Sequence, residues 1–129
     1  MIDLSEFTPA DNSRFNEYKQ QTYLIVTGNQ MRLKLGHKVG EEVTRYLGQK
    51  CRVLVQPITG EIAICRGDAK RVSQVNGSYY VSLSAEKEPF IKNHGEFRRM
   101  FFDVRWENDE RGNKFLYLEP NGRMERAER

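Results

Sequence analysis

The chain has 129 residues, of which 38% are hydrophobic and 30% charged, values typical of a single globular domain. No apolar run is long enough to cross a membrane and no basic, hydrophobic leader opens the chain, so we expect a cytoplasmic protein without a membrane partner. Its two cysteines and two histidines lack the spacing of metal ligands. We therefore expect no metal and no cofactor.

Residues 1–21 form a polar lead-in. Thr8-Pro9 has the chemistry of a helix start, because threonine caps a helix and proline suits its first turn. Free tails rarely carry as many aromatic residues as Phe7, Phe15 and Tyr18 provide. We expect either a short helix packed on the domain or partial disorder.

Residues 22–67 are predicted to form a hairpin, a short helix and a second hairpin. The run Tyr23–Thr27 is rich in β-branched and aromatic residues, and Gly28-Asn29 after it is a turn signal. Apolar and basic residues alternate in Met31–Leu35, as in a half-buried strand. Apolar residues then follow helical spacing over Lys38–Leu47. The second hairpin is predicted at Lys50–Pro57 and Glu61–Arg66.

The same order of elements recurs in residues 70–119. Strands at Arg71–Val75 and Tyr79–Leu83 flank Asn76-Gly77, a strong hairpin signal. A helix at Pro89–Phe97 precedes a final hairpin, and residues 120–129 are expected to fray. The strands of that hairpin are predicted at Met100–Glu107 and Lys114–Glu119. The sequence fits two tandem units (22–67 and 70–119) in one compact domain, or an α+β domain of eight strands without internal symmetry.

Eight apolar residues at strand or helix spacing are predicted to be mostly buried. They are Leu33, Leu35, Val43, Leu47, Val53, Val55, Val104 and Trp106. Cys51 and Cys65 lie on the two arms of one predicted hairpin. Two free thiols and a disulfide are both compatible with this placement, and the free thiols suit a reducing compartment.

Positive charge is concentrated in the first unit. Residues 22–67 hold seven basic and three acidic side chains, a net +4, whereas residues 68–119 hold nine of each. Six basic residues are candidates for a surface that binds phosphates, which requires only that cations share a face. They are Arg32, Lys34, Lys38, Arg45, Lys50 and Arg52.

The first unit resembles the SpoVT/AbrB swapped-hairpin family. The resemblance rests on Gly28-Asn29, Met31–Leu35, Arg45-Tyr46-Leu47-Gly48 and the hairpin Cys51–Cys65, and it extends more loosely over Arg71–Glu119. The sequence departs from the family in lacking a proline at the start of its first helix. The resemblance implies an α+β, mainly β fold in which two hairpin–helix–hairpin units interlock as a small pseudo-symmetric barrel.

The resemblance also implies a small non-enzymatic DNA-binding regulator, with Arg32 and Arg45 at positions similar to the family's basic sites. A protein-binding inhibitor or accessory factor of mobile-element type is the alternative. We see no nucleophile–base pair, phosphate-binding glycine loop or metal cluster that would indicate an enzyme. The expected partner is double-stranded DNA or else a protein, and the chain is expected to be a monomer or homodimer.

Overall fold

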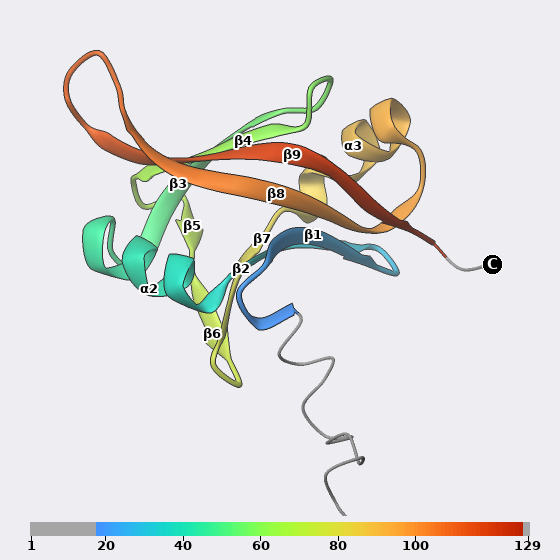
Figure 1. Cartoon of the computed structure of the whole chain (residues 1–129), viewed down its shortest axis with the longest axis horizontal. Helices are drawn as coiled ribbons and strands as arrows, with labels where there is room; N and C mark the ends of the chain where they lie inside the picture. Colours follow the sequence, from blue (N-terminus) through green and yellow to red (C-terminus); the bar gives the residue numbers. More distant parts are fainter. Residues whose placement is uncertain (1–17, 128–129) are drawn as a thin grey trace, which may run out of the picture.

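The computed structural model describes residues 18–127, so most of the expected lead-in helix lies outside the described residues (Figure 1). The described chain is mainly β, with two α-helices and one short 3-10 helix. The helices are α2 (His37–Tyr46), η2 (Ser84–Glu86) and α3 (Lys87–His94). The strands are β1 (Thr22–Thr27), β2 (Gln30–Leu35), β3 (Lys50–Gln56), β4 (Glu61–Arg66), β5 (Lys70–Arg71), β6 (Ser73–Val75), β7 (Ser78–Ser82), β8 (Phe97–Asn108) and β9 (Lys114–Arg126).

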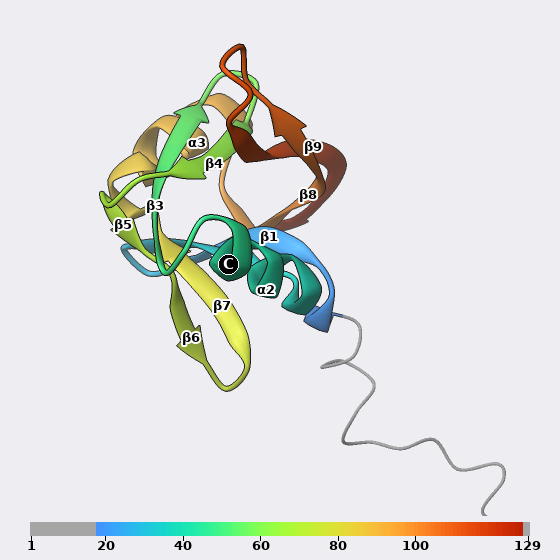
Figure 2. The ribbon, with the colours of Figure 1, turned by 90° about the vertical axis from the view of Figure 1, so that its left-hand side faces the viewer.

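All strands join one antiparallel sheet in the order β5-β3-β4-β9-β8-β1-β2-β7-β6. In this order the hairpins β3–β4 and β1–β2 of the first unit alternate with β8–β9 and β6–β7 of the second. Every contact between neighbouring hairpins therefore joins the two units. The expected interlocking of two hairpin–helix–hairpin units is confirmed, and the sheet curls into a nearly closed barrel (Figure 2).

The barrel closes through residues 70–75, which bend at Val72. Before the bend β5 pairs with β3, and after it β6 pairs with β7. The Val72 N–H donates to the Gln49 carbonyl oxygen at 2.8 Å, so the bend continues the contact with the β3 side. The single strand predicted at Arg71–Val75 is thus two short strands that belong to two neighbours.

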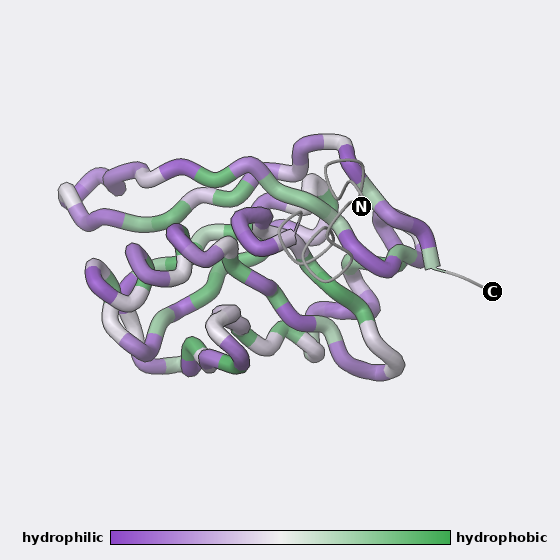
Figure 3. Tube along the Cα trace, turned by 60° about the horizontal axis from the view of Figure 1, so that its bottom comes forward, coloured by the Kyte–Doolittle hydropathy of each residue, from purple (hydrophilic) through white to green (hydrophobic). Residues whose placement is uncertain are grey.

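Hydrophobic and hydrophilic residues both occur along the strands (Figure 3). The apolar side chains that alternate to the inner face fill the barrel interior. Of the eight predicted core residues, Leu33, Leu35, Val43 and Leu47 are buried. The other four, Val53, Val55, Val104 and Trp106, are partly buried and pack against the core. Hairpin turns use the predicted residues, since Asn76 and Gly77 have φ values of 51° and 81°, as a type I′ turn requires.

Each helix packs on the barrel through a different kind of residue. In α2, Gly40 allows the helix to approach the ring of Tyr79, and Val43 is fully buried. In α3, Phe90 is fully buried. The first helix therefore makes a close backbone contact, while the second is anchored by one large side chain. Within residues 18–127, no helix has the length and apolar composition needed to cross a membrane.

The largest differences from the predicted boundaries are at α3, β8 and β9. Helix α3 begins at Lys87 and ends at His94, and Gly95 (φ 81°) turns the chain so that Phe97 starts β8. Strand β9 extends to Arg126, beyond the expected end at Glu119 and through residues expected to fray. A register shift between Met100 and Phe102 lets β9 pass Pro120 and continue pairing with β8.

The two cysteines are both free thiols. Cys51 is the neighbour of Arg66 across the β3–β4 ladder, whereas Cys65 is the neighbour of Arg52. Because adjacent residues of a strand point to opposite faces, Cys51 faces the core while Cys65 faces outward. Burial raises the pKa of the Cys51 thiol to about 11, so this thiol is a poor nucleophile at neutral pH.

Candidate nucleic-acid interface

Three cations share the outer surface of β3 and β5. Lys50 and Arg52 are two residues apart on β3 and therefore point to the same face. Arg71 of β5 lies directly opposite Lys50. All three side chains are exposed, and none makes an ion pair with another residue of the described chain. Like charges directly opposite each other in a sheet are unfavourable.

Helix α2 adds two exposed cations beside this cluster. Lys38 and Arg45 are seven residues apart, which places them about 10 Å apart along the helix axis and on nearly the same side. Glu41 lies between them on that side and contacts His37 Nε2 at 3.0 Å. The helix surface is therefore mixed in charge, and its basic character is strongest at the Arg45 end.

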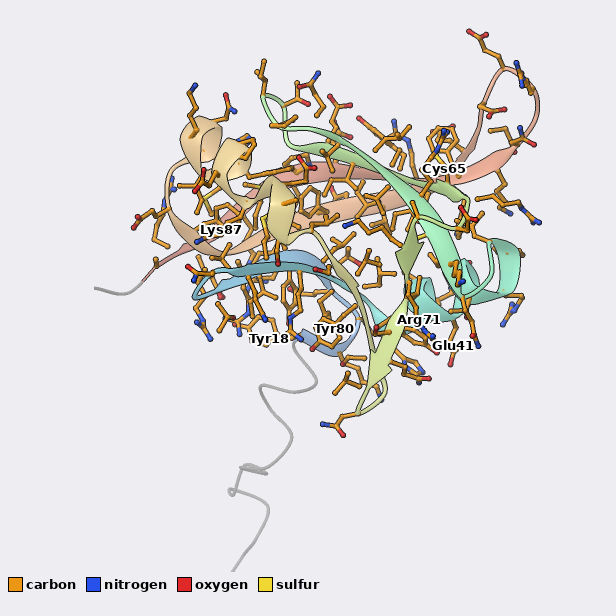
Figure 4. All side chains as sticks on the ribbon, turned by 180° about the vertical axis from the view of Figure 1, so that it is seen from behind. Tyr18, Glu41, Cys65, Arg71, Tyr80 and Lys87 are labelled. Carbon is orange, nitrogen blue, oxygen red and sulfur yellow. The ribbon has the colours of Figure 1, made fainter. Side chains whose placement is uncertain are left out.

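The end of α2 is held close to the strands that carry the cluster. Arg66 of β4 donates from Nη2 to the Tyr46 carbonyl oxygen at 2.9 Å. Thr44, Gln49 and Arg71 line one groove, so the last turn of α2 lies next to β5. Figure 4 shows Arg71 on the α2 side of the barrel and Lys87 on the opposite side, near α3.

Arg32 and Lys34 lie on a different strand, β2. They face outward from β2, and β7 together with the β5–β6 segment lies between β2 and β3. Arg32 stacks over the ring of Tyr80, with 4.6 Å from its guanidinium carbon to the ring centroid. It is partly exposed and cationic, but it does not share a face with Lys50 and Arg52.

Lys34 is a buried structural residue, with only 3% of its surface exposed. Its ammonium donates to three carbonyl oxygens of the segment that enters β1, those of Tyr18, Lys19 and Gln21. It also lies 5.3 Å from the centroid of the Tyr23 ring. Burial lowers the pKa of Lys34 to about 8. Its donors are thus used to hold residues 18–21 on the barrel.

The six predicted residues therefore occupy three elements. The structure places Lys50 and Arg52 on one face of β3 and Arg45 in the last turn of α2, with Lys38 two turns earlier on that helix. Arg32 and Lys34 lie apart from them on β2. Sequence reasoning left out Arg71, which completes the cluster. Its proximity to Lys50 depends on pairing between β5 and β3, two strands that are not consecutive in the chain, so no local pattern marks it.

Other chemistry-bearing residues serve the fold. His94 Nε2 lies 2.7 Å from the Pro57 carbonyl oxygen, and His37 Nδ1 lies 3.2 Å from that of Gly77. Among residues 18–127, no group of three or more His, Cys, Asp or Glu side chains is arranged to hold a metal ion. A cavity of about 530 Å³ beside α3 is lined by Lys87, Glu96 and Arg98 among others, with no Ser, Cys or His among its lining residues.

Comparison of the chain with models of known protein families, with curated protein sequences and with solved structures returned no match.

Proposed function

We propose that this protein is a small DNA-binding regulator that contacts duplex phosphates with the basic cluster around the end of α2. The observation that carries the proposal is the placement of Lys50, Arg52 and Arg71 on one outer surface without an anionic partner. Arg45 and, farther along α2, Lys38 extend this surface. The cytoplasm is the compartment we expect for this activity.

The physical argument is that neighbouring like charges in the cluster lower the stability of the sheet. Lys50 and Arg71 face each other across the β3–β5 ladder, an arrangement that destabilises a sheet when nothing neutralises it. A phosphate backbone would offset this repulsion, because it places negative charges along a line and requires no particular side-chain sequence. The alternating hairpins also support the proposal, since they match the interlocked arrangement that the family resemblance implies.

The proposed surface differs from the set expected from the sequence. Lys34 takes no part, because its ammonium is buried against three carbonyl oxygens. Arg32 lies on a separate strand and stacks on Tyr80, so a duplex seated on Lys50 and Arg52 would not reach it from the same face. Arg71 is added.

The test measures duplex affinity as a function of salt. Each cation that neutralises a phosphate contributes about −0.9 to the slope of log K against log salt. Changing Lys50 and Arg71 together to alanine should flatten the slope by roughly two units if both contact phosphates. The matched control changes Lys92 and Arg111 to alanine, since both are exposed and lie elsewhere in the fold.

Fluorescence anisotropy with a labelled random duplex at several salt concentrations provides the measurement. The control double removes the same formal charge and the same residue types, so it should leave the slope nearly unchanged. Equal slopes for the two doubles would mean that only net charge matters. An absence of duplex binding at low salt would rule out the proposal.

A protein-binding accessory role is the second candidate function. It is favoured by apolar side chains on the outside of the β3–β4 hairpin. Leu54 is 49% exposed and Ile58 72% exposed, and Leu54 lies opposite the outward-facing Ala63. Replacing Leu54 with serine should leave duplex binding intact and weaken only a protein contact, which a pull-down with a candidate partner and matched anisotropy would separate.

A further inference from the structure

Strand β6 has an unpaired edge. Leu83 N donates to the Met31 carbonyl oxygen, which fixes the direction of hydrogen bonding along β7. Because this direction alternates with each residue, Tyr80 and Ser78 bond to β6, while the N–H and C=O of Gln74 point away from β7. No hydrogen bond to the Gln74 backbone is present within the described chain. The Val72 N–H points to the same side and reaches Gln49.

More of the equivalent edge is paired in the other half of the barrel. Strand β1 corresponds to β6, because each is the first strand of the hairpin that precedes a helix. It pairs with β8 over Thr22–Ile25. The strand corresponding to β8 is β3, whose edge away from β4 pairs with only two residues of β5, Lys70 and Arg71. The chain leaves α2 and turns at Gly48 (φ 97°) just before β3 begins at Lys50, so the residues before Lys50 belong to this turn. They therefore do not run alongside β6.

A groove occupies the place of the missing strand. It has a volume of about 340 Å³ and lies between the last turn of α2 and β6. This volume corresponds to roughly ten water molecules at about 30 Å³ each. Its lining residues are Thr44, Gln49, Arg71, Val72, Ser73, Gln74 and Tyr79. The groove thus combines a free strand edge, an aromatic ring and one cation.

The groove is electrostatically suited to an acidic occupant. Arg71 is among its lining residues, Lys50 stands directly opposite Arg71, and none of the lining residues is acidic. Glu41 of α2 lies about one turn before Thr44, and its carboxylate contacts His37 Nε2 at 3.0 Å. A negatively charged side chain entering the groove would therefore meet a cation first.

We propose that this groove binds an extended, acidic segment of a protein partner, which adds to β6 as a further strand. The backbone of the segment would pair with the Gln74 N–H and C=O, as in other cases of strand addition. Alternate side chains would point toward Tyr79 and toward solvent, and an aspartate or glutamate would pair with Arg71. This inference shares Arg71 with the proposed duplex surface, and it adds a requirement for the uncharged backbone edge of β6, which duplex binding does not need.

The test uses a short fluoresceinated peptide of alternating valine and glutamate. Gln74→Pro removes the N–H that the peptide needs, while Gln74→Ala keeps it and serves as the matched control. Proline is tolerated on an edge where the N–H faces solvent. We expect Gln74→Pro to weaken peptide binding about tenfold or more, Gln74→Ala to change it little, and Arg71→Ala to weaken it about tenfold.

Two peptide controls keep the proposal falsifiable if Gln74→Pro fails to fold, which circular dichroism would reveal. A peptide N-methylated on the pairing edge should not bind, and a valine–lysine peptide should bind at least tenfold more weakly. Equal binding of the methylated peptide would reduce the interaction to charge alone and overturn strand addition. Sedimentation analysis tests whether a second copy of the chain occupies the groove instead. A dimer that is abolished by Gln74→Pro would mean that it does.

The two proposals fail separately. Gln74→Pro keeps every cation of the basic cluster, so a folded variant should bind duplex as the unmodified protein does. Loss of peptide binding with retained duplex binding supports the groove. Peptide binding in a protein that binds no duplex at low salt would support the groove and reject only the DNA proposal.

Discussion

Two equivalent corners of the barrel are built differently. At one corner β8, a strand of twelve residues, pairs with β1 over Thr22–Ile25 and so covers most of its edge. At the other corner β3 has seven residues, pairs with the two residues of β5 and leaves β6 uncovered. The order of elements is the same in both units. The difference therefore lies in where the strand after each helix begins to pair.

Charge follows the same division. On the outer face of the covered corner, Arg99 Nη1 contacts Glu125 Oε1 at 2.8 Å and its guanidinium lies near the rings of Tyr18 and Tyr23. At the uncovered corner, Lys50 and Arg71 face each other without such a partner. One corner uses its cations to stabilise the fold, and the other leaves them available for a ligand.

The largest expected effect concerns the α3 half. Phe90 is fully buried and is the main anchor of α3, so Phe90→Ala should lower the free energy of unfolding by about 3–5 kcal/mol. Denaturant titration provides the measurement. Lys92→Ala, an exposed change on the same helix, should stay within about 0.5 kcal/mol. A small loss at Phe90 would show that α3 contributes little to the barrel.

The next effect appears as a pH dependence of stability. The pKa of Lys34 is lowered to about 8 by burial, from an ordinary 10.5. Between these values the folded chain releases a proton that the unfolded chain keeps, so stability from this group rises with pH, by about 1–3 kcal/mol. Lys34→Met should remove this rise. The exposed change Lys38→Met should retain it, and a rise that survives in Lys34→Met would contradict the assignment.

A close helix contact at the uncovered corner gives a comparable or smaller effect. An alanine methyl at position 40 would lie 2.2 Å from Cδ2 of Tyr79, so Gly40→Ala should cost about 1–3 kcal/mol despite the better helix propensity of alanine. Combining it with Tyr79→Ala removes the clash. The two changes should then be clearly non-additive in thermal or denaturant unfolding, and strict additivity would mean that the helix shifts freely.

The smallest effect separates stability from binding. Lys50→Glu replaces a like-charge pair with an opposite-charge pair facing Arg71, and should stabilise the fold by about 0.2–1 kcal/mol. The same change should weaken duplex binding, because it reverses a charge in the proposed surface. Unfolding curves and anisotropy measured on one sample would test both effects. A variant that loses stability would show that the repulsion at this corner is already relieved.

Much of the fold follows from local patterns in the sequence. Alternation in Met31–Leu35 and the Asn76-Gly77 turn correctly predict β2 and the β6–β7 hairpin. The break at Val72 was not predictable, because it depends on which distant strands residues 70–75 pair with. The length of β9 depends in the same way on β8, whose register shift accommodates Pro120.

The candidate site was less predictable than the fold. Lys50 and Arg52 share a face because they are two residues apart on one strand, which alternation predicts. Lys34 also alternates outward, yet it is buried because residues 18–21 fold over it. Burial of a side chain by residues outside its own strand pair leaves no periodic pattern in the sequence. For the same reason the sequence marked Arg52 but not Arg71.

The alternation of hairpins has a consequence for the order in which the molecule can assemble during synthesis. The two hairpins of the first unit do not touch each other in the sheet, because β9 and β8 stand between β4 and β1. A chain released only as far as α3 would hold separate pieces of sheet with exposed edges. Residues 97–126 join those pieces. The barrel can therefore close only after residues 97–126 have left the ribosome.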